Sequence, residues 1–141
     1  MAGRDHYLDH LAGVPLFAAC SRKDLQRIAR AADEATIPEG KEFVHQGEIG
    51  REAFVIVSGT ATVRRNNKKI ATLGPGSCIG ELSLLDKGPR TASVTADSEL
   101  DVLVLGPREF SAVLEDVPGI SHKLLAALAG QVRELDNRVY G

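Results

Sequence analysis

The uneven distribution of glycine constrains the fold of this chain more than any other feature of the sequence. Most of the 14 glycines fall at short intervals between Gly40 and Gly88, and the runs between them are short, apolar and rich in β-branched residues. Short strands separated by turn residues are typical of an antiparallel sandwich or barrel. We therefore predict that residues 36–106 form an antiparallel β-roll, a double-stranded β-helix of the jelly-roll type.

Before this region, the sequence has helical patterns. Residues 1–35 are predicted to be helical, with a short helix that ends near Gly13. A second helix is expected to have Ser21 as its N-cap, with Asp24 three residues later as the acidic partner of a capping box. Within this helix, apolar residues recur at helical spacing.

After the glycine-rich region, Pro107 and Pro118 are each placed to begin a helix within residues 107–140. The second of these helices carries an apolar stripe that we interpret as a packing surface rather than a coiled-coil seam: Leu124, Leu125, Leu128, Val132, Leu135 and Val139. The predicted fold class is therefore α+β, a β-roll flanked by N- and C-terminal helices. At 141 residues, the length of the chain fits a single domain, 1–141.

Composition excludes several classes of function. A net charge of −2 and a pI of about 6.1 argue against an obligatory nucleic-acid-binding protein. No apolar run approaches the roughly 20 residues that cross a bilayer, and the N-terminus lacks the apolar core of a signal peptide. Cys20 and Cys78 lack the spacing of metal ligands. We expect a cytoplasmic protein that does not bind membranes.

The segment GELSLLDKGPRTASV, residues 80–94, carries the candidate site. Gly80 would let a ligand approach the backbone, and free N–H groups at the start of the following turn favour an anion. Arg90 supplies a planar, charged fork that suits phosphate oxygens. Glu81 repels phosphate but can accept a hydrogen bond from a sugar hydroxyl. Together these residues predict a ligand in which a phosphate is joined to ribose.

This segment resembles the phosphate-binding cassette of the cyclic nucleotide-binding domain family, which includes catabolite activator proteins, kinase regulatory subunits and cyclic-nucleotide-gated channels. The resemblance extends over roughly residues 14–138. It implies that Gly80 and the Ser83 N–H contact the cyclic phosphate, that Glu81 accepts from the ribose 2′-hydroxyl and that Arg90 pairs with a phosphate oxygen. It also places Thr91 beside phosphate and base. The full set of ligand-binding residues that it implies is Gly80, Glu81, Leu82, Ser83, Arg90, Thr91 and Ala92.

The resemblance further implies that the last helix acts as a lid over the base, with Leu135 and Arg138 as candidate contacts. Two features depart from the family pattern. Ile79 stands where Phe is usual, which changes packing but removes no polar contact. Many bacterial relatives also continue into a helix-turn-helix domain. We therefore expect that this chain alone does not bind DNA.

The other polar clusters have plainer interpretations. His6 and His10 are spaced as metal ligands can be, but no third ligand is evident, and His45 alone does not make the metal site of a cupin-like enzyme. The basic segment RRNNKK, residues 64–69, is interpreted as a solvated hairpin tip. No nucleophile–base signature or carboxylate cluster points to catalysis. We expect no enzyme activity, no metal and no cofactor.

These observations predict a regulatory module that senses a cyclic nucleotide, with cAMP favoured and cGMP compatible with Thr91. Ligand binding would reposition the lid helix and signal to a protein partner or a second copy of the chain. The alternative is a degenerate cyclic nucleotide-binding fold that holds a protein partner without nucleotide.

Overall fold

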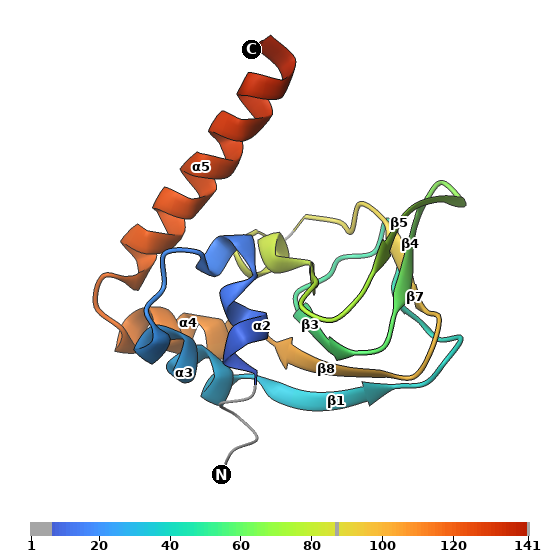
Figure 1. Ribbon diagram of the computed structural model, residues 1–141, viewed down its shortest axis with the longest axis horizontal. Coiled ribbons are helices and arrows are strands. Elements are labelled where there is room, and N and C mark those ends of the chain that lie inside the picture. The colour runs from blue at the N-terminus through green and yellow to red at the C-terminus, as the bar shows by residue number, and fades with distance from the viewer. Residues whose placement is uncertain (1–6, 87, 141) are drawn as a thin grey trace.

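The computed structural model describes residues 7–86 and 88–140, and for Leu82 and Tyr140 it describes only the backbone. Along the chain, helices precede and follow the strands, and in space these helices gather on one side of the strands (Figure 1). The helical segments are α2 (Leu8–Ala12), η1 (Pro15–Phe17), α3 (Arg22–Ala31), η2 (Glu81–Leu84), α4 (Pro107–Asp116) and α5 (Ile120–Tyr140). The strands are β1 (Asp33–Ile37), β2 (Glu42–Val44), β3 (Ala53–Ser58), β4 (Ala61–Arg65), β5 (Lys68–Leu73), β6 (Cys78–Ile79), β7 (Ser93–Ala96) and β8 (Leu100–Leu105).

The strands form two antiparallel sheets, with the orders β1-β8-β3-β6 and β2-β7-β4-β5. Most connections carry the chain from one sheet to the other, and this alternation produces a roll. A cluster of buried apolar residues fills the interior: Ile37, Val44, Phe54, Ile56, Ala61, Ile79, Val94, Ala96, Leu100 and Val102. The predicted β-roll flanked by helices is therefore confirmed.

Strand β3 is buried on both of its faces. Phe54 and Ile56 belong to the interior cluster of the roll, whereas Val55 packs with the apolar residues of the helices. Burial on both faces explains why the sequence AFVIV is an uninterrupted apolar run rather than an alternating one. The sheet that contains β3 thus connects the roll to the helical layer.

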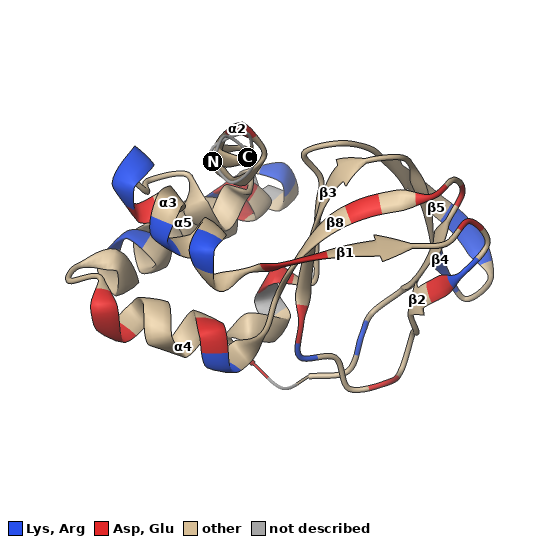
Figure 2. Cartoon of the chain, turned by 90° about the horizontal axis from the view of Figure 1, so that it is seen from below, with Lys and Arg blue, Asp and Glu red and all other residues tan. Residues whose placement is uncertain are grey.

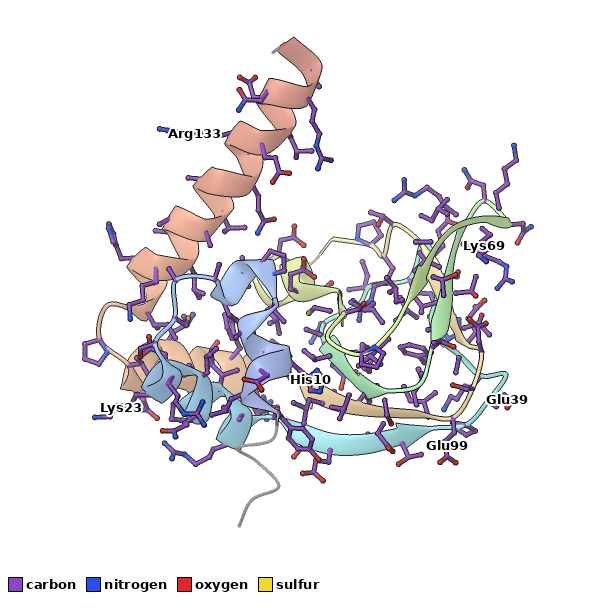
Figure 3. All side chains as sticks on the ribbon, in the orientation of Figure 1. His10, Lys23, Glu39, Lys69, Glu99 and Arg133 are labelled. Atoms are coloured by element: carbon purple, nitrogen blue, oxygen red, sulfur yellow. The ribbon has the colours of Figure 1, made fainter. Side chains whose placement is uncertain are left out.

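The hairpin between β4 and β5 has the predicted two-residue turn. Asn66 and Asn67 have φ angles of 53° and 66°, both in the left-handed region that asparagine tolerates. Arg65 pairs with Lys68 across the turn. The hairpin tip carries a concentration of Lys and Arg (Figure 2), and Lys69 lies there, far from the helices (Figure 3).

Two element boundaries and one strand differ from the sequence prediction. Strand β1 begins at Asp33, so residues 33–35 belong to the sheet rather than to the predicted helical segment 1–35. Four of its five residues are exposed, so the strand lacks an apolar pattern. The short strand β6 was not predicted at all. Helix α5 begins at Ile120 rather than Pro118, because Gly119 has a φ of 81°, which is not helical. Residues 1–6, including His6, lie outside the described part of the chain.

Helix α5 projects away from the roll along most of its length (Figure 1). Leu124 is buried and Leu128 is partly buried against the helical core. The remaining members of the predicted stripe are 59–71% exposed: Leu125, Val132, Leu135 and Val139. The packing interpretation is therefore wrong for these four residues in this conformation, because only the start of α5 contacts the other helices. No helix in residues 7–86 and 88–140 combines the length and hydrophobicity needed to cross a membrane.

Polar contacts hold the start of α5 and the end of α4 to helix α3. Ser21 and Asp24 form the predicted capping box at the start of α3, which is confirmed. Lys123 on α5 donates to Asp24 Oδ2 at 2.6 Å, and Arg27 pairs with Asp116 of α4 at 2.5 Å. The hydrogen bond from Lys123 lowers the pKa of Asp24, and the capping bonds act in the same direction.

We expect Asp24→Asn to destabilise the protein by about 1–2 kcal/mol near pH 7, through weakened charge-assisted hydrogen bonds. Because the pKa of Asp24 is lower in the folded state, its ionised carboxylate contributes fully to the free energy of unfolding above the unfolded pKa of about 4. This contribution is lost as the pH falls further, so the wild-type and variant curves should converge in acid. Urea unfolding between pH 7 and pH 3 measures this. Glu39→Gln, a change at an exposed side chain, is the control (Figure 3). If the stability curves of the wild type and Asp24→Asn stay parallel down to pH 3, the pH dependence does not come from Asp24.

Candidate functional site

A cavity of about 390 Å³ lies beside the segment that carries the predicted site. Six of the residues implied by the resemblance line it: Gly80, Glu81, Ser83, Arg90, Thr91 and Ala92. The remaining residues of the cavity wall are mostly apolar: Val44, Val63, Arg65, Ile70, Leu73, Cys78, Ile79, Asp86, Gly88, Pro89 and Val94. Leu82 is part of η2, and its side chain lies outside the described residues. The volume is that of a small-molecule site.

Gly80 connects strand β6 to the single turn of η2. Its φ is 77°, and a Cβ atom at this position would lie 2.1 Å from Arg90 Nη1. Glycine is therefore required both by the backbone conformation and by the close approach of the guanidinium. The Ser83 N–H donates to the Gly80 carbonyl at 3.0 Å, so its contact with a phosphate stays a prediction.

The Arg90 side chain is held at the cavity wall by two hydrogen bonds. Nη1 donates to Ser83 Oγ at 3.0 Å, and Nη2 donates to the Glu52 carbonyl oxygen at 2.8 Å. Partial burial lowers the pKa of Arg90, while the Glu52 carboxylate opposes this shift. The guanidinium stays protonated, because an arginine side chain does not lose its proton in proteins. Within the described residues, no carboxylate forms an ion pair with Arg90, although the Glu52 carboxylate is near enough to interact with its charge.

The loop between β2 and β3 positions Arg90, and sequence reasoning missed its part in the site. The Arg90 N–H donates to the Glu48 carbonyl at 2.8 Å, and its own carbonyl accepts from the Gly47 N–H at 2.9 Å. A Cβ atom at Gly50 would lie 1.6 Å from Arg90 Nε. Gly50 and Glu52 are separated from Arg90 by about 40 residues. The glycine-rich pattern of the sequence included Gly50, and it was the only sequence signal for this loop.

Glu81 begins η2 and lines the cavity next to Cys78. The thiol of Cys78 is near enough to the Glu81 carboxylate to interact with it. Burial raises the pKa of the Cys78 thiol well above its usual range, and the nearby carboxylate adds to this shift. The thiol is therefore protonated and can donate, which leaves Glu81 with further acceptor capacity toward the cavity.

Thr91 and Ala92 follow Arg90 along the same wall of the cavity. The Thr91 carbonyl accepts a hydrogen bond from Arg65 Nε at 3.0 Å. Ile79, which stands where the family pattern has Phe, is buried and paired with Phe54 in the sheet. It therefore contributes to both the interior cluster and the cavity wall.

The two candidate lid residues lie away from the cavity in this conformation. Leu135 is 59% exposed, and Arg138 pairs with Glu134 of the same helix at 2.9 Å. Arg133, also on α5, points away from the roll (Figure 3). Neither Leu135 nor Arg138 is among the described residues that line the cavity, so their contact with a ligand stays a prediction.

Comparisons with known proteins identify relatives that match most of this chain. The chain is 31% identical over 131 residues to the cyclic AMP receptor protein of Thermus thermophilus, covering 89% of this chain and 61% of the relative. It is 29% identical over 119 residues to a cAMP-dependent protein kinase regulatory subunit of Hypocrea atroviridis, covering 84% of this chain and 26% of the relative. It thus spans less than two thirds of either protein.

The fold of the chain also matches solved structures. The N-terminal domain of a transcriptional regulator from Streptomyces coelicolor has a TM-score of 0.81 and 33% identity, over 87% of this chain and 91% of that one. The sequence profile of the cyclic nucleotide-binding domain matches residues 34–117, which include the roll, the cavity wall and α4. The chain therefore belongs to the cyclic nucleotide-binding domain family.

Proposed function

We propose that this chain is a cytoplasmic, non-enzymatic regulatory module that binds a 3′,5′-cyclic nucleotide, preferentially cAMP. The observation that carries the proposal is that Arg90, which forms no ion pair within the described residues, lies on the wall of a cavity of about 390 Å³. A cyclic phosphate carries a single negative charge, which one arginine can balance. In a partly buried site, such a charge-assisted pair is among the stronger polar contacts.

The cavity provides a separate group for each part of this ligand. Arg90 and the Ser83 hydroxyl lie together and would hold the phosphate, and the Arg90 guanidinium lies against the backbone at Gly80. Glu81 would accept from the ribose 2′-hydroxyl. The apolar side chains of the wall would face the base: Val63, Ile70, Leu73 and Val94. This division between polar and apolar walls is typical of small-molecule sites.

The preference for cAMP is supported by the relatives. A cyclic AMP receptor protein and a cAMP-dependent kinase regulatory subunit both match most of this chain. A threonine at position 91 is compatible with guanine as well, so cGMP is the second candidate ligand.

The proposed response to ligand is a movement of α5. The second half of this helix has an exposed apolar face, and the cavity has exposed apolar residues at its own margin, including Ile70, which is 50% exposed. Covering both surfaces together would remove apolar area from water. A ligand shifts such an equilibrium only if it binds the two positions of the helix with different affinity. A protein partner or a second copy of the chain would then detect the new position of α5.

We expect the distance between α5 and the roll to shorten when cAMP binds. A pair of spectroscopic probes, one attached at position 133 on α5 and one at position 69 on the hairpin, measures this distance. Arg133 and Lys69 suit the labels because both side chains are exposed and lie far apart (Figure 3). Cys20 and Cys78 are replaced by alanine, and the unlabelled variant is first shown to bind. The change should saturate with cAMP and be absent with 5′-AMP. An unchanged distance at saturating cAMP, in the monomer and in any self-associated form, would refute the lid.

A further inference from the structure

Arg65 lines the cavity although it lies outside the segment that matches the family's phosphate-binding pattern. It is the last residue of β4 and belongs to the basic hairpin tip that sequence reasoning interpreted as solvated. Its side chain is exposed, but its Nε donates to the Thr91 carbonyl at 3.0 Å. One edge of the guanidinium is thus attached to the wall that carries Arg90, and Arg65 forms no ion pair within the described residues.

A second set of hydrogen bonds fixes the hairpin turn beside Arg65. The Gln46 side chain makes two bonds with Asn66, both 2.9 Å: its Nε2 donates to Asn66 Oδ1 and its Oε1 accepts from the Asn66 N–H. The Gln46 N–H donates to Ser93 Oγ at 2.9 Å. The next residue, Gly47, bonds to the Arg90 backbone. The hairpin tip is therefore attached to the same loop that positions Arg90.

These hydrogen bonds fix Arg65 on the cavity wall, next to the surface that we propose for the base. If Arg90 and Ser83 hold the phosphate, the base must lie along the remaining apolar wall, which includes Val63 on the same strand as Arg65. Arg65 then lies at the edge of the base, with its Nη1 and Nη2 groups not engaged by other described residues. This step rests on the proposed function.

We infer that Arg65 is a specificity-determining residue that donates to the N7/O6 edge of a purine. Guanine presents two acceptors on this edge, N7 and O6, which an arginine can contact with two parallel hydrogen bonds. Adenine presents one acceptor, N7, and a donor at N6 that opposes the guanidinium. Arg65 therefore increases the affinity for cGMP more than the affinity for cAMP, and it reduces the preference for cAMP set by the rest of the site.

Calorimetric titration of wild type and Arg65→Ala with cAMP and cGMP tests this inference. The variant should bind cGMP about 5–10-fold more weakly, the lower part of the range for bidentate contacts to bases, and change less than about twofold toward cAMP. Arg64→Ala is the matched control, because Arg64 precedes Arg65 on the exposed tip but does not line the cavity. It should leave both affinities unchanged. Gln46→Ala, which releases the turn, should shift the ratio in the same direction as Arg65→Ala.

Replacing cGMP by its 7-deaza analogue isolates the proposed contact. Wild type should lose affinity for the analogue because the N7 acceptor is missing, whereas Arg65→Ala should bind both ligands equally. If Arg65→Ala weakens both nucleotides by the same factor, or changes neither, Arg65 does not read the base and the inference is overturned. If wild type binds neither cyclic nucleotide, the proposed function fails, and this inference fails with it.

Discussion

Arg90→Ala is expected to remove measurable cyclic nucleotide binding at micromolar ligand while leaving the fold intact. Arg90 is the cation that we expect to pair with the phosphate, and its two side-chain hydrogen bonds go to Ser83 Oγ and the Glu52 carbonyl, neither of which is charged. Removing a charge-assisted hydrogen bond costs roughly 1.5–3 kcal/mol, or about 10–150-fold in affinity. The loss at this position should reach or exceed the upper value, because a charged ligand would be left without a counter-ion in a partly enclosed site.

Two further variants make this result specific to the site. Arg90→Lys should bind weakly, because a lysine keeps the charge but loses the planar fork and the bond pattern of the guanidinium. Arg108→Ala, on the exposed surface of α4, should bind as wild type does. Circular dichroism and urea unfolding check the fold. Wild-type affinity in a folded Arg90→Ala protein would show that the phosphate binds elsewhere.

Glu81→Ala is expected to weaken cAMP binding by about tenfold or more, the equivalent of losing one hydrogen bond to a charged group. The distinctive result concerns the sugar. Wild type should bind cAMP more tightly than 2′-deoxy-cAMP, because the carboxylate accepts from the 2′-hydroxyl. The variant should bind the two nucleotides equally.

Competition titrations with both nucleotides measure this effect, and Asp86→Ala serves as the acidic control from the same cavity wall. Asp86 accepts from the Gly88 N–H at 3.0 Å, which assigns it a local role in the loop. Its removal should preserve the preference for cAMP over the 2′-deoxy analogue. Persistent discrimination in the Glu81→Ala protein would exclude Glu81 from the ribose contact.

The parts of the fold that sequence predicted well are those coded by neighbouring residues. The Ser21–Asp24 capping box and the Asn66–Asn67 turn both depend on bonds within a few positions. The same holds for the segment from Gly80 to Arg90, whose residues meet at one cavity because a single turn and a short loop join them. Local chemistry was sufficient in each case.

The parts that sequence reasoning missed depend on contacts between distant segments. Strand β1 is held by backbone pairing with β8, so its exposed residues carried no apolar signal. Gly50 and Arg65 reach the site from the β2–β3 loop and from β4, and their local sequence does not connect either residue with the segment from Gly80 to Ala92. The apolar stripe of α5 indicated a helix with a buried face, but the pattern cannot specify which surface covers it.

The most direct test of the central claim is calorimetric titration of the purified chain with cAMP, cGMP and 5′-AMP, after removal of any nucleotide that co-purifies. We expect saturable binding of one cyclic nucleotide per chain, with cAMP bound more tightly than cGMP and 5′-AMP bound far more weakly than either. Absence of binding to both cyclic nucleotides by a folded protein would contradict this expectation. The roll and last helix would then be assigned to a nucleotide-independent interaction module.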